Sequence, residues 1–255
     1  MISIQESVST GALRPFRKLG RAVAEHWRWP VEVKIVNGRR MFVDLRSAVG
    51  RGIFATRAFD PAVFEPLRSA LKPGGTFLDI GANVGYYSML ALDLVGESGA
   101  IHAFEVDDRP LQCLHKTKLR QGLSNLYVHE VAVGAQEGIG VLTLMPDCGH
   151  NMVRATGTGP AVQLTDLDTW RKKHLVHNIQ AIKIDIEGGE LAAVQGAQEL
   201  IQHERPVIVC EANVEWFPPG TVYETHQLVG LLESFDYSIR WLENVCSPTI
   251  VAQPL

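Results

Sequence analysis

The sequence predicts an α/β fold in which a mostly parallel sheet carries helices on both faces and an N-terminal appendage precedes the sheet. From about residue 61 onward, apolar strand patterns alternate with helical patterns, and parallel neighbouring strands need such crossover connections. Before residue 60 the pattern differs, because a helical segment is followed by two short alternating runs. A chain of 255 residues is long enough for one large α/β domain with a modest appendage.

The appendage is assigned to residues 1–60. Between about residues 11 and 29, apolar side chains recur on one helical face and basic side chains occupy the others. The dipeptide Asn37-Gly38 lies between two alternating segments and predicts a β-hairpin. We expect a cap or an interface here, through which a homo-oligomer could form. A basic helix also fits a solvated face or an anionic membrane surface.

The second domain, residues 61–255, is predicted to hold the sheet. Its strands are expected at about residues 76–80, 100–104, 126–131, 181–185, 206–211, 237–242 and 249–251, with a further strand near 140–145. The segment 146–160 is rich in Gly, Asn and Thr, and this composition favours a loop over the strand tips.

The turn after the first predicted strand is the strongest indication of a ligand site. Asp79 lies near the end of that strand, and Gly81 and Gly85 permit backbone conformations that a Cβ would block, ahead of a helix at about residues 84–95. A dinucleotide fingerprint requires G-x-G-x-x-G, but Asn83 occupies the position of its second glycine. The spacing therefore disfavours an NAD-dependent oxidoreductase. It favours a cofactor with a cationic amino-acid end, such as S-adenosylmethionine.

A second carboxylate is expected at the tip of the neighbouring strand, where Glu105 follows residues 100–104. Two carboxylate oxygens can accept hydrogen bonds from both ribose hydroxyls of an adenosine. Dinucleotide folds use an acidic residue in the same way, so Glu105 alone does not separate the two cofactors. The glycine spacing does.

A third group of carboxylates follows the strand predicted at residues 181–185, where Asp185, Glu187 and Glu190 lie around a glycine pair. Glu190 is expected in the first turn of a helix, where a carboxylate interacts favourably with the free N–H groups. One helix start does not need three carboxylates, so Asp185 and Glu187 are candidates for a functional role beside the cofactor.

Five motifs together resemble the FkbM-type methyltransferases, and they lie at residues 79–88, 103–105, 131–134, 164–168 and 182–190. The resemblance extends from about residue 65 to residue 211. It implies the seven-stranded class I methyltransferase fold, a Rossmann-like arrangement, and S-adenosylmethionine as cofactor. It also implies methyl transfer, mostly to hydroxyl oxygen on sugars, glycans and secondary metabolites in natural product biosynthesis, and in some members to amide nitrogen. Val106 stands where the family typically has proline, but the preceding carboxylate is retained.

The resemblance also assigns residues to the cofactor. Gly81, Asn83 and Gly85 would meet its methionine end, and Asp79 would face the ammonium directly or through water. Glu105 would hold the ribose. The adenine would lie between two further residues, Val106 and Ala132.

The acceptor hydroxyl must lose its proton during attack, which requires a general base or a metal ion. Asp185 is the first candidate base, His150 on the predicted covering loop is the second, and Glu187 is placed with them as a catalytic candidate. Asp185, Glu187 and Glu211 could also offer oxygen ligands to Mg²⁺. No histidine accompanies them at a fixed spacing, so a metal is not favoured and no metal ligand is assigned.

Charge and cysteine content restrict the partners. A net charge of −4 and a pI of about 6.1 argue against a nucleic-acid partner, which normally leaves a basic footprint. The four cysteines are scattered without a C-x-x-C pair, and we expect reduced thiols in a cytoplasmic protein. Neither a signal peptide nor a transmembrane segment is expected. A cofactor-binding subunit without catalytic activity stays open as an alternative.

Overall fold

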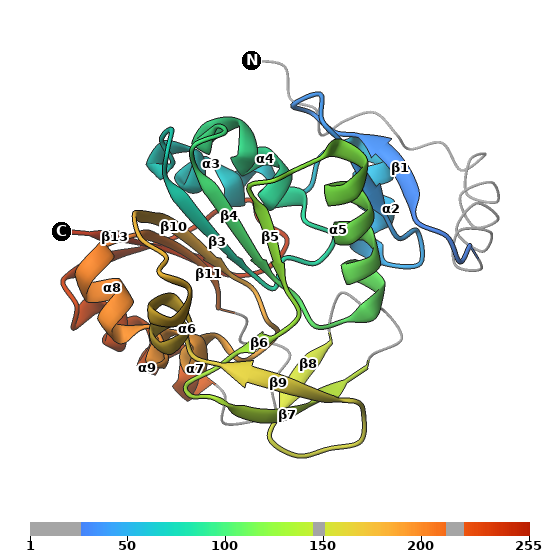
Figure 1. Cartoon of the computed structure of the whole chain (residues 1–255). Coiled ribbons are helices and arrows are strands. Elements are labelled where there is room, and N and C mark those ends of the chain that lie inside the picture. The colour runs from blue at the N-terminus through green and yellow to red at the C-terminus, as the bar shows by residue number, and fades with distance from the viewer. Residues whose placement is uncertain (1–26, 145–150, 213–221) are drawn as a thin grey trace.

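A computed structural model of the chain describes residues 27–144, 151–212 and 222–255. Figure 1 shows a central twisted sheet with helices on both faces, a short hairpin at one side and a small second sheet beyond the ends of the central strands. The helix expected within residues 11–29 falls almost entirely outside the described residues, and so does His150.

The strands and helices alternate along most of the chain, as the sequence predicts. The strands are β1 Val31–Lys34, β2 Arg40–Val43, β3 Thr76–Ile80, β4 Ala100–Phe104, β5 Leu126–His129, β6 Ala132–Val133, β7 Gly138–Thr143, β8 Met152–Arg154, β9 Ala161–Thr165, β10 Ile179–Ile184, β11 Val207–Glu211, β12 Tyr237–Trp241 and β13 Thr249–Pro254. The helices are α2 Ala48–Thr56, α3 Pro61–Ala70, α4 Tyr86–Val95, α5 Asp108–Gln121, α6 Leu167–His174, α7 Glu190–Gln195, α8 Gln198–Glu204 and α9 Val222–Glu233.

The central sheet has seven strands in the order β12-β13-β11-β10-β3-β4-β5. Its neighbours from β11 to β5 pair in parallel, whereas β13 runs antiparallel to both β11 and β12. The chain builds outward from β3 through β4 to β5, and later returns to the other side of β3 with β10. The strand order therefore reverses between β3 and β10, and open α/β sheets bind ligands at such a point.

Two apolar cores cover the two faces of this sheet, because successive side chains of a strand point to opposite faces. Phe77 of β3 packs with α3, α4 and α5, whereas Leu78, its neighbour, packs with the helices of the other face, α6 to α9. Both side chains are fully buried. A strand buried on both faces reads as one continuous apolar run, which is why the predicted limits of β3 and β4 match the structure.

A small four-stranded sheet, in the order β6-β9-β7-β8, follows β5 in the chain. The prediction of a loop throughout residues 146–160 is wrong for Met152–Arg154, which pairs antiparallel with β7. Residues 145–150 lie outside the described part of the chain. The strand expected at 140–145 is found two residues earlier, and β9 is not among the expected strands. These short, half-exposed strands lack the apolar run that makes β3 and β4 recognisable.

The hairpin β1–β2 forms a sheet of its own and packs on α5. The Phe42 amide donates a hydrogen bond of 2.9 Å to the Thr117 hydroxyl on that helix. Val33 and Met41 are buried in the same apolar core as α3, α4 and α5. The appendage is therefore joined to the main sheet by shared core packing.

Within the described ranges, no helix combines the length and the apolar character needed to cross a membrane. Cys210 and Cys246 are free thiols, and Cys113 is buried. Cys148 lies outside the described residues.

Three imidazoles and an indole pack together over the β4–β5 edge of the sheet. His102 Nδ1 lies 3.0 Å from His129 Nε2, and Trp170 packs edge-on against both rings. Burial, together with the neighbouring His129 and His174, lowers the pKa of His102 from 6.5 to about 3. Burial and His174 also lower the pKa of His129, to about 4.

His102 should make the protein sensitive to acid. Below pH 6.5 the unfolded chain takes up a proton that folded His102 does not, so the free energy of unfolding falls as the pH drops towards 3. From pH 6.5 to about pH 4.5 this group contributes a loss of about 2 to 3 kcal/mol. We expect His102→Gln to flatten that part of the profile in urea unfolding measured against pH. The exposed His203→Gln is the control, and equal slopes for the two variants would contradict the assignment.

Candidate functional site

A cavity of about 530 Å³ lies where the strand order reverses. Residues from the carboxyl ends of β3, β4, β10 and β11 form one side of it. Residues of all four strands of the small sheet, together with Ala48 and Val49 of α2, line it as well. The appendage and the small sheet therefore both contribute walls to a site whose position is set by the central sheet.

The β3–α4 turn is held against β10 by its backbone. The Asp185 amide donates to the Ile80 carbonyl, with an N–O distance of 3.1 Å. Gly81 has φ 73°, and a Cβ added to it would overlap the backbone carbonyl of Asp185. Glycine is therefore required at this position for two reasons, the left-handed backbone and the close approach of the two strand ends.

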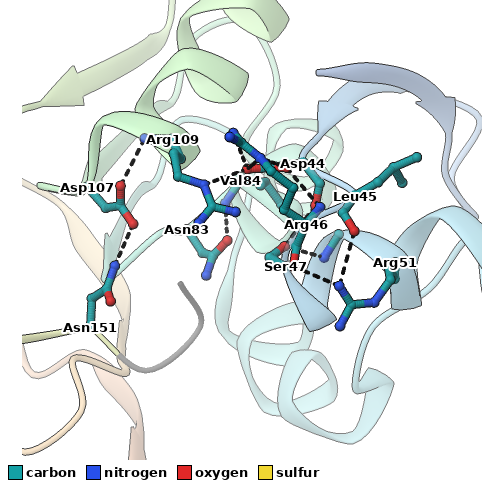
Figure 2. A network of polar contacts seen from close by, with 11 residues as sticks. Asp44, Leu45, Arg46, Ser47, Arg51, Asn83, Val84, Asp107, Arg109 and Asn151 are labelled. Atoms are coloured by element: carbon teal, nitrogen blue, oxygen red, sulfur yellow. Dashed lines mark hydrogen bonds and ion pairs between the residues drawn. The ribbon is translucent and has the colours of Figure 1, made fainter. Parts of the chain in front are cut away.

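Asn83 also has a left-handed backbone, with φ 51°. Asparagine tolerates that conformation better than most residues. It can therefore adopt the backbone conformation that glycine would adopt here, and it adds a polar side chain. Its Oδ1 accepts a hydrogen bond of 2.8 Å from the Val84 amide (Figure 2). Asn83 lines the cavity, whereas Gly85 forms the N-cap of α4 and is not among the lining residues.

Glu105 is fixed by three backbone amides. Its Oε2 accepts from Asn83 at 2.8 Å, and its Oε1 accepts from Val106 at 2.7 Å and Asp107 at 2.9 Å. Burial raises the pKa of Glu105, although these three amides oppose the shift. The carboxylate lines the cavity in one orientation, and each oxygen keeps acceptor capacity for a ligand hydroxyl.

Asp79, which is expected to face a ligand ammonium directly or through water, does not line the cavity. Its side chain is fully buried, and its Oδ2 accepts from both the amide and the hydroxyl of Ser88, at 3.1 and 2.6 Å. Successive side chains of β3 point to opposite faces of the sheet. Asp79 therefore lies on the same buried face as Phe77 and does not reach the cavity at the edge of the sheet. Burial raises the pKa of Asp79, while Lys183 and Ser88 act in the opposite direction.

Lys183 is the residue of this site to which the sequence analysis assigned no role. It lies in the middle of β10 directly beside Asp79 of β3, and its side chain is only 5% exposed. Its Nζ donates to the Gly81 carbonyl at 2.9 Å and lies 3.2 Å from Asp185 Oδ2 and 3.7 Å from Asp79 Oδ1. Burial would lower the pKa of Lys183, but Asp185 and Asp79 outweigh it and raise the pKa. The sequence does contain a signal for this role, which is a lysine between two isoleucines of a buried strand. A buried charge needs partners, so such a lysine indicates carboxylates nearby.

Asp185, Glu187 and Glu211 lie together at the edge of the sheet. In the pairing of β10 with β11, Ile184 is opposite Cys210, so the next residues, Asp185 and Glu211, are neighbours. One carboxylate oxygen from each of the three residues lies within 4.8 Å of the others. All three line the cavity. Burial and the neighbouring Asp185 raise the pKa of Glu211 to about 9.

Glu190 is in the first turn of α7, as predicted, but its carboxylate is turned back onto the preceding loop. It accepts from the Ile186 amide at 3.0 Å and from the Gly188 amide through both oxygens, at 3.1 and 2.9 Å. Burial raises its pKa to about 7. Glu190 therefore holds the loop that carries Glu187.

A polar network connects the appendage to the cavity (Figure 2). Asp44 is 3% exposed and accepts from Arg46 and, at 2.9 Å, from Arg109 Nε. Burial would raise the pKa of Asp44, but the hydrogen bonds from Arg46 and Arg109 outweigh it and lower the pKa. The Arg109 amide donates to Asp107, which also accepts from Asn151 next to β8. The first turn of α5 thus ties the hairpin segment to the small sheet.

The predicted residues divide into three groups. Five of the cofactor candidates line the cavity, and they are Gly81, Asn83, Glu105, Val106 and Ala132. Two of the catalytic candidates, Asp185 and Glu187, line it as well. Asp79 and Gly85 support the turn from outside the cavity, and His150 is not among the described residues.

Comparison with known families gives one match, and its model is described as a methyltransferase FkbM domain. It covers residues 79–239, which is more than half of the chain and includes the end of β3 and all of β4, β10 and β11. A search of curated protein sequences finds no significant match.

Solved structures share the fold at low sequence identity. A precorrin-6y C5,15-methyltransferase from Geobacter metallireducens is 17% identical with a TM-score of 0.50, over 84% of this chain and 97% of that one. An O-methyltransferase from Bacillus cereus, solved with SAH, is 16% identical with a TM-score of 0.50, over 76% and 80%. A methyltransferase FkbM from Methylobacillus flagellatus is 19% identical with a TM-score of 0.49, over 75% of this chain but only 52% of that longer one. The fold is that of the class I methyltransferases.

Gly81→Ala should disturb the junction of β3 and β10. A left-handed backbone costs an alanine about 1 to 2 kcal/mol, and the overlap with the Asp185 carbonyl adds to it, so we expect a loss of about 2 to 4 kcal/mol in the free energy of unfolding. Gly122→Ala is the matched control, because Gly122 has φ 62° but open space around it. Urea unfolding of both variants measures the difference. Equal losses would show that the close approach is unimportant.

Proposed function

Because the chain belongs to the FkbM methyltransferase family, we propose that it transfers a methyl group from S-adenosylmethionine to a hydroxyl oxygen on a sugar, glycan or secondary metabolite. The observation that carries this proposal is the pair formed by Glu105 and Asp185, which line one cavity from the two sides of β3. One carboxylate suits a ribose and the other suits an acceptor hydroxyl.

The cofactor side of the cavity fits an adenosine. Glu105 is already oriented by three amides, so it can accept from ribose hydroxyls without rearrangement. Val106 and Ala132 offer apolar surface for the adenine ring. The turn at Gly81 and Asn83 lies at the same end of β3, where it would meet the methionine part.

Asp79 is buried under Ser88, so the ammonium of the cofactor would need a different group for direct contact. In this proposal Asp79 acts by holding Lys183 and the α4 turn in place. The carboxylates that line the cavity provide, as a group, the negative potential that a ligand with a cationic amino-acid end requires.

The acceptor side contains the candidate base. The Lys183 ammonium, 3.2 Å from Asp185 Oδ2, favours the ionised carboxylate, which can then take a proton. When bound, the cofactor supplies a methyl group made electrophilic by its sulfonium. Asp185 would take the proton of the acceptor hydroxyl as that oxygen is methylated, and the cofactor would leave as S-adenosylhomocysteine. Tyr86 and Tyr87 also line the cavity.

Binding and turnover together test this function. Calorimetry should show binding of S-adenosylmethionine and S-adenosylhomocysteine but not of NAD. A screen with methyl-labelled cofactor over sugars, glycans and amides should then transfer label to a hydroxyl-bearing acceptor. Label on amides alone would favour the N-methyltransferase alternative. Cofactor binding without any transfer would favour a silent subunit, and preferential binding of NAD would contradict the proposal.

Asp185→Asn separates catalysis from cofactor binding. Losing the proton acceptor should lower turnover by about 100-fold or more, because general base catalysis typically supplies a factor of 10² to 10⁴. Cofactor affinity should stay within a few-fold, since Glu105 and the β3–α4 turn are unchanged. Glu199→Gln, which alters an exposed ion pair on α8, is the control. Turnover near that of the unmodified enzyme would exclude Asp185 as the base.

A further inference from the structure

We propose that Asp185, Glu187 and Glu211 form a binding site for a divalent cation at the acceptor end of the cavity. The sequence left such a metal as a disfavoured alternative, since no histidine accompanies these residues. The structure adds two observations that the sequence could not supply. One is the distance between the three carboxylates, and the other is a buried oxygen of Glu211 that has no hydrogen-bond partner among the described residues.

The spacing of the carboxylates fits one ion. Oxygen ligands bind Mg²⁺ at about 2.0 to 2.1 Å and Ca²⁺ at about 2.3 to 2.6 Å, so ligands on opposite sides of one ion lie about 4 to 5 Å apart. The three carboxylate oxygens lie within 4.8 Å of one another. A calcium-sized ion fits this spacing directly, whereas Mg²⁺ requires an inward shift of a few tenths of an ångström. All three ligands are hard oxygens, as both ions prefer.

Glu211 carries an unsatisfied buried oxygen into this site. The residue is 8% exposed, and its Oε2 has no hydrogen-bond partner among the described residues. Leaving a buried carboxylate oxygen without a partner is costly. The nearby Glu105 and Glu190 are different, because backbone amides bond to both oxygens of each. A cation between the three carboxylates would supply the partner that Glu211 lacks.

The charge balance points the same way. Asp79, Asp185, Glu187, Glu190 and Glu211 lie close together along the ends of β3, β10 and β11. Lys183 contributes one positive charge to this wall, and its contacts are to Asp79, Asp185 and the Gly81 carbonyl. A divalent cation would add positive charge to this acidic group. If the proposed function holds, the ion would also lie where it can orient an acceptor oxygen and make its hydroxyl more acidic.

The test is titration of the cofactor-free protein with Mn²⁺, followed by electron paramagnetic resonance of the unbound ion. We expect one saturable site per chain with a dissociation constant at or below about 1 mM, and displacement of Mn²⁺ by Ca²⁺ or Mg²⁺. Glu211→Gln and Glu187→Gln should each weaken binding by at least tenfold. Glu137→Gln, a change at an exposed residue before β7, should leave it unchanged.

Two results would overturn the site. One is the absence of saturable Mn²⁺ binding, and the other is binding that neither Glu211→Gln nor Glu187→Gln weakens relative to Glu137→Gln. Thermal unfolding of each variant shows whether it is folded, and two ligand variants guard against the failure of either. The titration contains neither cofactor nor acceptor. A protein that binds Mn²⁺ at this site but transfers no methyl group would therefore contradict the proposed function and support the cation site.

Discussion

The ammonium of Lys183 is the interaction on which the site depends. It is buried at the point where the strand order reverses, and it contacts Asp79 of β3, the Gly81 carbonyl and Asp185 after β10. Removing one partner of a buried ion pair typically costs about 3 to 5 kcal/mol, because the remaining charge is left without compensation. Lys183 therefore fixes two strand ends to each other and, by the same contacts, sets the position of the candidate base.

The outer walls are attached to this centre by polar contacts. Asp44 of the hairpin segment accepts from Arg109 at the start of α5, and Asp107 in the same turn accepts from Asn151, next to β8 of the small sheet. Ala48, which follows the hairpin, lines the cavity. The appendage is thus a wall of the site as well as a cover for the core. A change in the appendage can therefore reach the cavity directly at Ala48 or through the contacts with α5.

The sequence predicts the parts of this protein that depend on local pattern. Strands buried on both faces, such as β3 and β4, appear as apolar runs, and the spacing of Gly81, Asn83 and Gly85 indicates the type of turn. It does not show where a side chain ends in three dimensions. For example, it does not show that Ser88, nine residues after Asp79, closes over the Asp79 carboxylate. Of the small sheet, the sequence indicates only a strand near β7, because the other strands are short and half exposed, and pairing between distant segments stabilises them.

The carboxylates of the site differ in their hydrogen-bond partners. These partners distinguish structural carboxylates from those available for chemistry better than the position of each residue in a sequence motif does. Glu105 and Glu190 are bound by backbone amides, and Asp79 by Ser88 and Lys183, so their orientations are set by the fold itself. At Glu211, by contrast, the fold leaves one buried oxygen without a hydrogen-bond partner among the described residues, on the wall that it shares with Asp185 and Glu187. A buried acceptor without a donor is tolerated where a ligand supplies the missing contact. The acceptor side of the cavity is therefore where charge is left for a bound molecule or ion to balance.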